Sequence, residues 1–139
     1  MMSLFDAMDI AGTSLSAQTV RLNAIASNMA NANTVSSTPE DTYKAKTPLF
    51  KAVLESQLSG DASQMGVQID RIEELGDEPR AEFNPGHPLA DENGYIYRPD
   101  IDVATEMVNM MQASRSFQNS IEAINTAKQL AMRTLTLGK

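Results

Sequence analysis

The single histidine of this 139-residue chain, His87, is the first side chain to consider for chemistry. A general base or a metal ligand at this position would need a nucleophile or further ligands close to it. His87 instead lies in residues 84–91, Asn-Pro-Gly-His-Pro-Leu-Ala-Asp, where two prolines make a rigid turn. We interpret it as a turn residue that hydrogen-bonds locally or packs on a neighbouring subunit.

The other residue types that could do chemistry are also poorly arranged for it. The acidic pairs are adjacent rather than spaced as in a metal-binding loop: Glu73-Glu74, Asp77-Glu78 and Asp91-Glu92. Neither a dinucleotide-binding nor a P-loop glycine pattern occurs, and the absence of cysteine excludes disulfides and thiol catalysis. The sequence therefore predicts no catalytic residue, no cofactor and no metal, and favours a protein that is not an enzyme.

Two long segments free of proline, one at each end of the chain, dominate the pattern instead. All six prolines lie between residues 39 and 99. In the first segment apolar residues recur at heptad spacing, with Gln18 as a polar interruption. They are Leu4, Met8, Ala11, Leu15, Leu22, Ile25, Met29 and Ala32. We expect a helix that ends near residues 31–34, where Asn, Thr and Ser replace the apolar period.

The second segment steps by four and three residues, with polar interruptions at Ser114 and Lys128. Its apolar positions are Val103, Met107, Met110, Phe117, Ile121, Ile124, Ala131 and Leu135. Asp100 or Asp102 can cap this helix at its start. The two helices are close enough in length to pair as an antiparallel, coiled-coil-like hairpin. Met107, Met110, Met111 and Met132 are expected to fill gaps in the packing, because methionine adapts its shape.

Charge distinguishes the three parts of the chain. Acidic and basic residues number 2 and 1 in residues 1–32, 13 and 6 in residues 33–101, and 3 and 4 in residues 102–139. An acidic insert argues against a nucleic acid or an anionic membrane as partner. Between Asp9 and Glu40 the only charged side chain is Arg21. Because a solitary coiled coil is normally lined with charge, we infer that the first helix packs against more than one neighbour.

The predicted organisation is a first helix in residues 1–34, an acidic insert in residues 35–101 and a second helix in residues 102–139. The fold class is mainly α with a small β element. Short strands are expected at residues 67–72, 80–83 and 94–98, whereas residues 43–58 fit either a strand or a helical turn. The N-terminus lacks the pattern of a cleaved signal peptide, and no stretch is apolar and long enough to insert into a membrane.

Two segments resemble known signatures. Residues 21–34, RLNAIASNMANANT, resemble the N-terminal signature of the flagellar rod, hook and hook-associated axial proteins. Residues 94–117 resemble the C-terminal signature of that family, although Pro99-Asp100-Ile101 stands where Pro-Asn-Val is common and Phe117 where Tyr is usual. The turn at residues 85–91 and the ending Leu-Thr-Leu-Gly-Lys are most similar to the proximal-rod members.

The resemblance implies a structural subunit of the bacterial flagellar basal body, located in the rod that spans the periplasm. Such a subunit polymerises with itself and other rod proteins into a shaft that transmits torque from motor to hook. It would leave the cytoplasm through the flagellar type III export apparatus and could contact the surrounding ring proteins. We expect the assembly interface to include Met8, Leu15, Leu22, Ile25, Asn28, Met29, Asn31, Asn33, Met107, Met110, Phe117, Ile121, Ile124 and Leu135.

An alternative from a different class is a soluble cytosolic coiled-coil adaptor or chaperone that binds one protein partner. That alternative accounts for the heptads. It does not account for the nearly uncharged first helix or for the two signatures.

Overall fold

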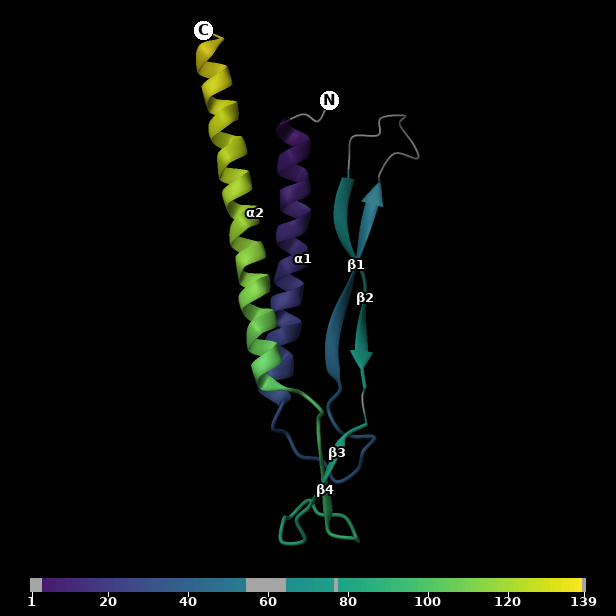
Figure 1. The fold of residues 1–139 in the computed structure, drawn as a ribbon. Helices are drawn as coiled ribbons and strands as arrows, with labels where there is room; N and C mark the ends of the chain where they lie inside the picture. The colour runs from purple at the N-terminus through teal and green to yellow at the C-terminus, as the bar shows by residue number, and fades with distance from the viewer. Residues whose placement is uncertain (1–3, 55–64, 77, 139) are drawn as a thin grey trace. The chain divides into compact units, whose positions relative to one another are not determined.

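The structure is a computed structural model that describes residues 4–54, 65–76 and 78–138. Along the chain, one long helix precedes four strands and a second long helix follows them (Figure 1). Helix α1 spans Leu4–Asn31 and helix α2 spans Val103–Leu137. Between them lie β1 (Ala45–Leu54), β2 (Met65–Leu75), β3 (Arg80–Phe83) and β4 (Tyr95–Arg98). The predicted fold class, mainly α with a smaller β part, is confirmed.

Local signals set the helix ends. The carboxylate of Asp102 accepts hydrogen bonds from the backbone N–H groups of Ala104 (3.2 Å) and Thr105 (3.3 Å), and so caps α2. Asp100, the other predicted cap, forms an ion pair with Arg80 instead. At the end of α1 the carbonyl oxygen of Asn31 accepts bonds from the backbone N–H and the hydroxyl of Thr34. These bonds satisfy a carbonyl that the helix leaves free.

The strands form two two-stranded sheets, one of β1 and β2 and one of β3 and β4. Residues 43–58, for which the sequence allowed a strand or a helical turn, contain strand β1. The prediction of only short strands is wrong for β1 and β2, which have 10 and 11 residues. Pro48 lies inside β1, where an edge strand tolerates it because one side of its backbone makes no ladder bonds. Strand β3 pairs antiparallel with β4, and Phe83 is opposite Tyr95.

The chain folds as two compact units that do not follow the order of the sequence. One unit comprises Met1–Leu22, Pro48–Arg71 and Gln112–Lys139, and the other comprises Asn23–Thr47 and Ile72–Met111. Each unit therefore contains a part of each helix and a part of the insert. The predicted division into residues 1–34, 35–101 and 102–139 matches the order of the elements along the chain. That these three segments are separate domains stays a prediction.

Each unit has one hydrogen bond between the side chains of α1 and α2. In the first unit the hydroxyl of Ser120 donates to that of Ser14 (3.2 Å), and in the second the amide of Asn28 donates to Glu106 (3.2 Å). Asn28 lies fourteen residues after Ser14 in α1. Its partner Glu106 lies fourteen residues before Ser120 in α2. The helices therefore pair antiparallel, as predicted.

Small residues form most of the buried apolar core. Of eight buried apolar side chains in the described residues, six are alanines. They are Ala11, Ala17, Ala24, Ala32, Ala113 and Ala127, to which Ile25 and Ile96 add larger side chains. Alanine lets two helix backbones approach closely but buries little apolar area. The buried apolar core of the described residues is therefore small.

The predicted stepped positions of α2 coincide only in part with the side that the chain covers. Met110, Ser114, Phe117 and Ile124 are half-buried, whereas Lys128 and Leu135 are exposed. Ala113 and Ala127 are buried, one residue before the predicted Ser114 and Lys128. The large apolar side chains assigned to the same seam, Met107 and Ile121, are 52% and 39% exposed. Periodicity favoured the larger residues, whereas the buried positions of α2 carry alanine.

Candidate functional site

The predicted interface residues of α1 are mostly half-buried in the folded chain. Ile25 and Asn28 are buried, and half-buried positions continue along the helix at Met8, Leu15, Leu22, Met29 and Asn31. Asn33, just beyond the helix, is exposed. Most of these α1 side chains therefore contribute first to the packing of the chain itself.

The predicted interface residues of α2 divide into two groups. Met110, Phe117 and Ile124 are half-buried, whereas Met107, Ile121 and Leu135 are exposed by 52%, 39% and 71%. The prediction that the α2 methionines fill gaps in the packing is wrong for three of four. Met107, Met111 and Met132 are exposed, and only Met110 is half-buried. The exposed group leaves an apolar surface on the outside of the helix.

That surface is larger than the sequence pattern indicated. Eight of the fifteen large apolar side chains that are exposed in the described residues belong to α2. They are Met107, Val108, Met111, Ile121, Leu130, Met132, Leu135 and Leu137. An extended set of exposed apolar residues on one element marks a surface made for association. A heptad scan misses Val108, Leu130 and Leu137, because it selects a single face of the helix.

The side-chain amide of Asn28 is the most heavily bonded polar group within the helices. It is 2% exposed. Its nitrogen donates to the carbonyl oxygen of Lys46 (3.0 Å) and to the carboxylate of Glu106 (3.2 Å). Its oxygen accepts from the backbone N–H of Lys46 (2.8 Å) and from the hydroxyl of Tyr43 (3.0 Å). All four hydrogen-bonding positions of the amide are therefore occupied.

The contacts of Asn28 join three elements within one compact unit. The pair of bonds with Lys46 reproduces the pattern that a neighbouring strand would offer, so that the side chain of α1 satisfies the backbone of β1. Glu106 belongs to the first turn of α2 and also accepts a bond from Asn109 (3.3 Å). Ser27 adds a hydroxyl contact to Tyr43 (2.9 Å). We refer to Asn28, Tyr43, Lys46 and Glu106 as the Asn28 junction.

In the other compact unit, α1 also contacts the β insert. The hydroxyl of Thr13 accepts a hydrogen bond from the backbone N–H of Val67 in β2 (3.2 Å). Its side chain also lies beside Gly66, where an added Cβ would be 3.5 Å from the hydroxyl oxygen. Strands of the same chain are thus among the neighbours of α1. They account for part of the shortage of charge on this helix.

The turn between β3 and β4 is organised by Asp91 and contains His87. The Asp91 carboxylate accepts from the backbone N–H groups of Asn93 (2.9 Å) and Tyr95 (2.8 Å) and from the hydroxyl of Tyr97 (3.2 Å). The bond from Tyr95, the largest effect, together with those from Asn93 and Tyr97, lowers the pKa of Asp91 below its ordinary value. Burial, followed by the bond to Asp91, raises the pKa of Tyr97.

His87 takes part in the same turn. Its Nδ1 atom accepts a hydrogen bond from the backbone N–H of Leu89 (3.1 Å). This local bond agrees with the interpretation of His87 as a turn residue. The turn also needs Gly94, which has φ +82° and whose added Cβ would lie 3.0 Å from Phe83 and from Pro85. The geometry of these residues is that of a tightly built hairpin end.

No helix among the described residues is long and apolar enough to cross a membrane. The candidate functional surface is the set of exposed apolar residues of α2 described above.

Comparison with known proteins assigns the two helical ends to two families of flagellar rod proteins. Residues 8–35 match the family described as flagella basal body rod protein. Residues 92–137 match the family described as flagellar basal body rod FlgEFG protein C-terminal. The first match contains most of α1, and the second contains β4 and α2. Both predicted signatures are therefore confirmed.

Full-length relatives give the same assignment. The chain is 45% identical to the flagellar basal-body rod protein FlgC of Yersinia enterocolitica and 44% identical to that of Salmonella typhimurium. It is 41% identical to FlgC of Escherichia coli O157:H7. Each comparison covers 99% of this chain and 100% of the relative. The chain thus belongs to the family of the flagellar basal-body rod protein FlgC.

Proposed function

We propose that this chain is a structural subunit of the flagellar basal-body rod that polymerises through its terminal helices. The observation that carries the proposal is the exposed apolar surface of α2, in a chain whose relatives along its whole length are rod proteins. In a helical assembly, Met107, Ile121 and Leu135 would be covered by neighbouring subunits. The rod so formed would transmit torque from the motor to the hook, with this subunit in its proximal part.

Assembly and folding are coupled in this proposal. The helix pair buries mainly alanine, and the Oε1 atom of Gln18 is buried without a hydrogen-bond partner among the described residues. An unpaired buried polar atom costs free energy, so that the isolated helix pair is weakly stabilised. Helices gain most of their stability from packing. Contact between α2 and neighbouring subunits would therefore stabilise the helices at the growing end of the rod.

The finer parts of the proposal concern location and partners. The subunit would cross from the cytoplasm to the periplasm through the flagellar type III export apparatus. Its partners would be further copies of itself, other rod proteins and the surrounding basal-body rings. The acidic insert, residues 35–101, would lie toward the outside of the rod. The chain would act by assembly rather than by catalysis, without nucleic acid or membrane insertion.

Motility complementation with Ile121→Asp tests the proposal. Ile121 is 39% exposed on α2, so that aspartate can be solvated in the free chain but not in a packed assembly. We expect the variant to be exported and to fail to support swimming. The matched control is Leu89→Asp in the β3–β4 turn, at a leucine that is 43% exposed, which should be exported and should support swimming. Full swimming by a strain with exported Ile121→Asp would contradict the role of this surface.

A further inference from the structure

Residues 93 and 94 form the only Asn-Gly pair of the chain, in the turn between β3 and β4. An asparagine followed by glycine is especially prone to deamidation, because glycine has no side chain to shield its backbone nitrogen and rotates freely. In this reaction the nitrogen of Gly94 attacks the Cγ atom of Asn93, and a succinimide ring forms. The bond from Cγ to the side-chain nitrogen breaks, and that nitrogen leaves as ammonia with the proton of the Gly94 amide.

Water then opens the succinimide ring at one of its carbonyl carbons. Opening at Cγ restores the ordinary backbone and leaves an aspartate side chain. Opening at the backbone carbonyl carbon gives isoaspartate, in which the main chain runs through Cβ and Cγ and is one atom longer. The sequence therefore makes Asn93 a modification site in any state of the chain in which both residues rotate freely.

In the folded chain, hydrogen bonds hold both residues of this pair. The N–H of Gly94 donates to the carbonyl oxygen of Asp91 (3.0 Å), and the carbonyl oxygen of Gly94 accepts from the N–H of Asn84 (2.9 Å). The N–H of Asn93 donates to the carboxylate of Asp91 (2.9 Å). The ring closes only after the Gly94 nitrogen has lost its proton, and its bond to a carbonyl oxygen stabilises the protonated form. These bonds therefore oppose the attack on Cγ.

Rigidity of the hairpin, rather than burial, is what separates Asn93 from the reaction. Its side chain is exposed, so that water has access to it. The hairpin around it is anchored to the rest of its compact unit. Ile96 is 0% exposed, and Tyr97 exchanges two backbone hydrogen bonds with Ser36 (2.9 and 3.0 Å). A hairpin fixed in this way opens rarely, and a reaction that needs the open form is slowed in proportion.

We propose that the β3–β4 hairpin protects Asn93 from deamidation, and that a chain already converted to isoaspartate does not rebuild the hairpin. Chains that fold promptly keep Asn93, whereas chains that stay unfolded lose it with time. Protection of Asn93 is a property of the hairpin and does not depend on assembly of the chain into a rod.

The isoaspartate product does not fit the turn. Asp91 and Tyr95 close the turn through two hydrogen bonds of 2.8 Å, one between their backbones and one from the N–H of Tyr95 to the Asp91 carboxylate. An extra main-chain atom between these residues changes the separation that both bonds require. Gly94 has little room to shift, since even an added Cβ would lie 3.0 Å from Phe83 and from Pro85. The modified chain therefore loses the bonds that define the hairpin end.

Peptide mass spectrometry of the purified full-length chain tests the protection. The chain is incubated in mildly alkaline buffer with and without guanidinium chloride, and the conversion of Asn93 is followed with time. We expect conversion to be at least about tenfold faster in guanidinium chloride, where the hairpin is open. Equal rates in the two solutions, or a faster rate in the folded chain, would overturn the proposal.

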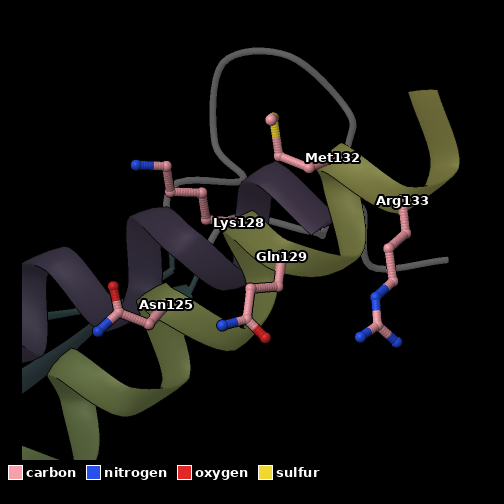
Figure 2. A pocket seen from close by; sticks show the side chains of 5 residues that line it. All are labelled: Asn125, Lys128, Gln129, Met132 and Arg133. Carbon is pink, nitrogen blue, oxygen red and sulfur yellow. The ribbon is translucent and has the colours of Figure 1, made fainter. Parts of the chain in front are cut away.

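Asn125 is an internal reference in the same samples. Its side chain extends from α2 beside Lys128 and Gln129 (Figure 2). It is exposed, as Asn93 is, but the residue after it is Thr126, whose branched side chain shields the backbone nitrogen. Conversion of Asn125 should stay slow in both solutions, which separates the effect of the hairpin from that of the solvent.

Replacement of Asp91 tests which bonds protect the pair. Asp91→Ala keeps the Asn93-Gly94 sequence but removes the carboxylate that accepts from Asn93. Conversion in the buffer without guanidinium chloride should rise about tenfold, and conversion in guanidinium chloride should not change. Glu92→Ala is the matched control, since it removes the neighbouring exposed carboxylate, and should leave both rates unchanged. An unchanged rate in Asp91→Ala would refute the protective role of this carboxylate.

Refolding tests the second half of the proposal. Chains aged in guanidinium chloride are returned to native buffer, and chains with isoaspartate are separated from unmodified chains. Backbone amides of β3 and β4 should be protected from hydrogen exchange in the unmodified chains and unprotected in the isoaspartate chains. The Asn93→Asp variant adds the charge without the extra main-chain atom and should keep the protection. Equal protection in the isoaspartate and unmodified chains would overturn the exclusion of modified chains.

Discussion

The side chain of Asn28 forms two hydrogen bonds with the backbone of Lys46, at 3.0 and 2.8 Å, as a neighbouring strand would do. The same amide bonds Glu106 in α2, so that one residue of α1 holds both the β insert and the other helix. Since the amide is 2% exposed, any group left unpaired by its removal is kept from water. The Asn28 junction therefore connects α1, β1 and α2, so that the packing of each element depends on the other two.

Replacement of Asn28 tests this link. Asn28→Ala should weaken the fold by about 1–3 kcal/mol, because it leaves the backbone of Lys46 without its partners in a buried place. Incorporation into basal bodies should fall in parallel. Asn23→Ala is the matched control, since Asn23 is an exposed asparagine of the same helix. Equal incorporation of the two variants would show that the junction does not stabilise the assembled form.

Enlargement of a buried alanine tests the close approach of the helices. Ala113 is 0% exposed, so that Ala113→Leu should force α1 and α2 apart at a cost of about 1–3 kcal/mol. Ala123→Leu adds the same side chain at an exposed position of α2 and should have little effect. Basal-body yield and swimming speed measure the difference. If Ala113→Leu assembled as well as Ala123→Leu, the alanine contact would not limit helix packing.

Charge in the packed positions of the seam should block assembly. Leu22 and Ile124 are half-buried, one in each helix. Leu22→Asp or Ile124→Asp places a carboxylate in the packed helical layer, at a cost of several kcal/mol. Motility complementation, with export measured separately, reports the effect. An exported variant that supports full swimming would refute the assignment of that residue to the seam.

Much of the fold could be predicted because its signals are local. The capping by Asp102, the end of α1 near Asn31 and strand β3 follow from residues a few positions apart. The inward face of α2 was mispredicted because Ala113 and Ala127 carry no strong hydrophobic signal, whereas Met107 and Ile121 do. The hydrophobic pattern of a helix shows where large apolar side chains recur. It does not show where small side chains such as alanine are buried.

The Asn28 junction could be predicted only in part. Asn28 belongs to the signature in residues 21–34, and so it was expected at the assembly surface. Its partners Lys46 and Glu106 lie 18 and 78 positions away, and no local pattern connects them. The exposed apolar residues of α2 raise the same difficulty. A helix with apolar residues on several faces does not reveal which face its own chain covers.

Acid should weaken the β3–β4 hairpin through Asp91. Because hydrogen bonds lower the pKa of Asp91 in the folded chain, its stabilising contribution is complete above the ordinary value of 3.8 and is lost as pH falls through the lowered value. The protection of the β3 and β4 amides, expressed relative to their intrinsic exchange rates and measured between about pH 6 and pH 2.5, should fall most at the acidic end. Asp91→Asn should show less of this dependence. An identical pH profile in the variant would refute the role of the carboxylate.

The free subunit should show weak protection of its helices. Few large side chains are buried between α1 and α2, and the outer surface of α2 lacks its neighbours. Hydrogen exchange of residues 4–31 and 103–137 should be fast in dilute monomer and slow in assembled rods. Strong protection throughout both helices in the monomer would contradict the coupling of folding to assembly.

Quantitative mass spectrometry of detergent-purified hook–basal bodies, compared with the cytosol of the same cells, tests the rod assignment most directly. The account predicts that this chain is enriched in the particle at a fixed ratio to the ring proteins. A chain that remained in the cytosol and was absent from the particle would contradict the account and favour a soluble coiled-coil adaptor.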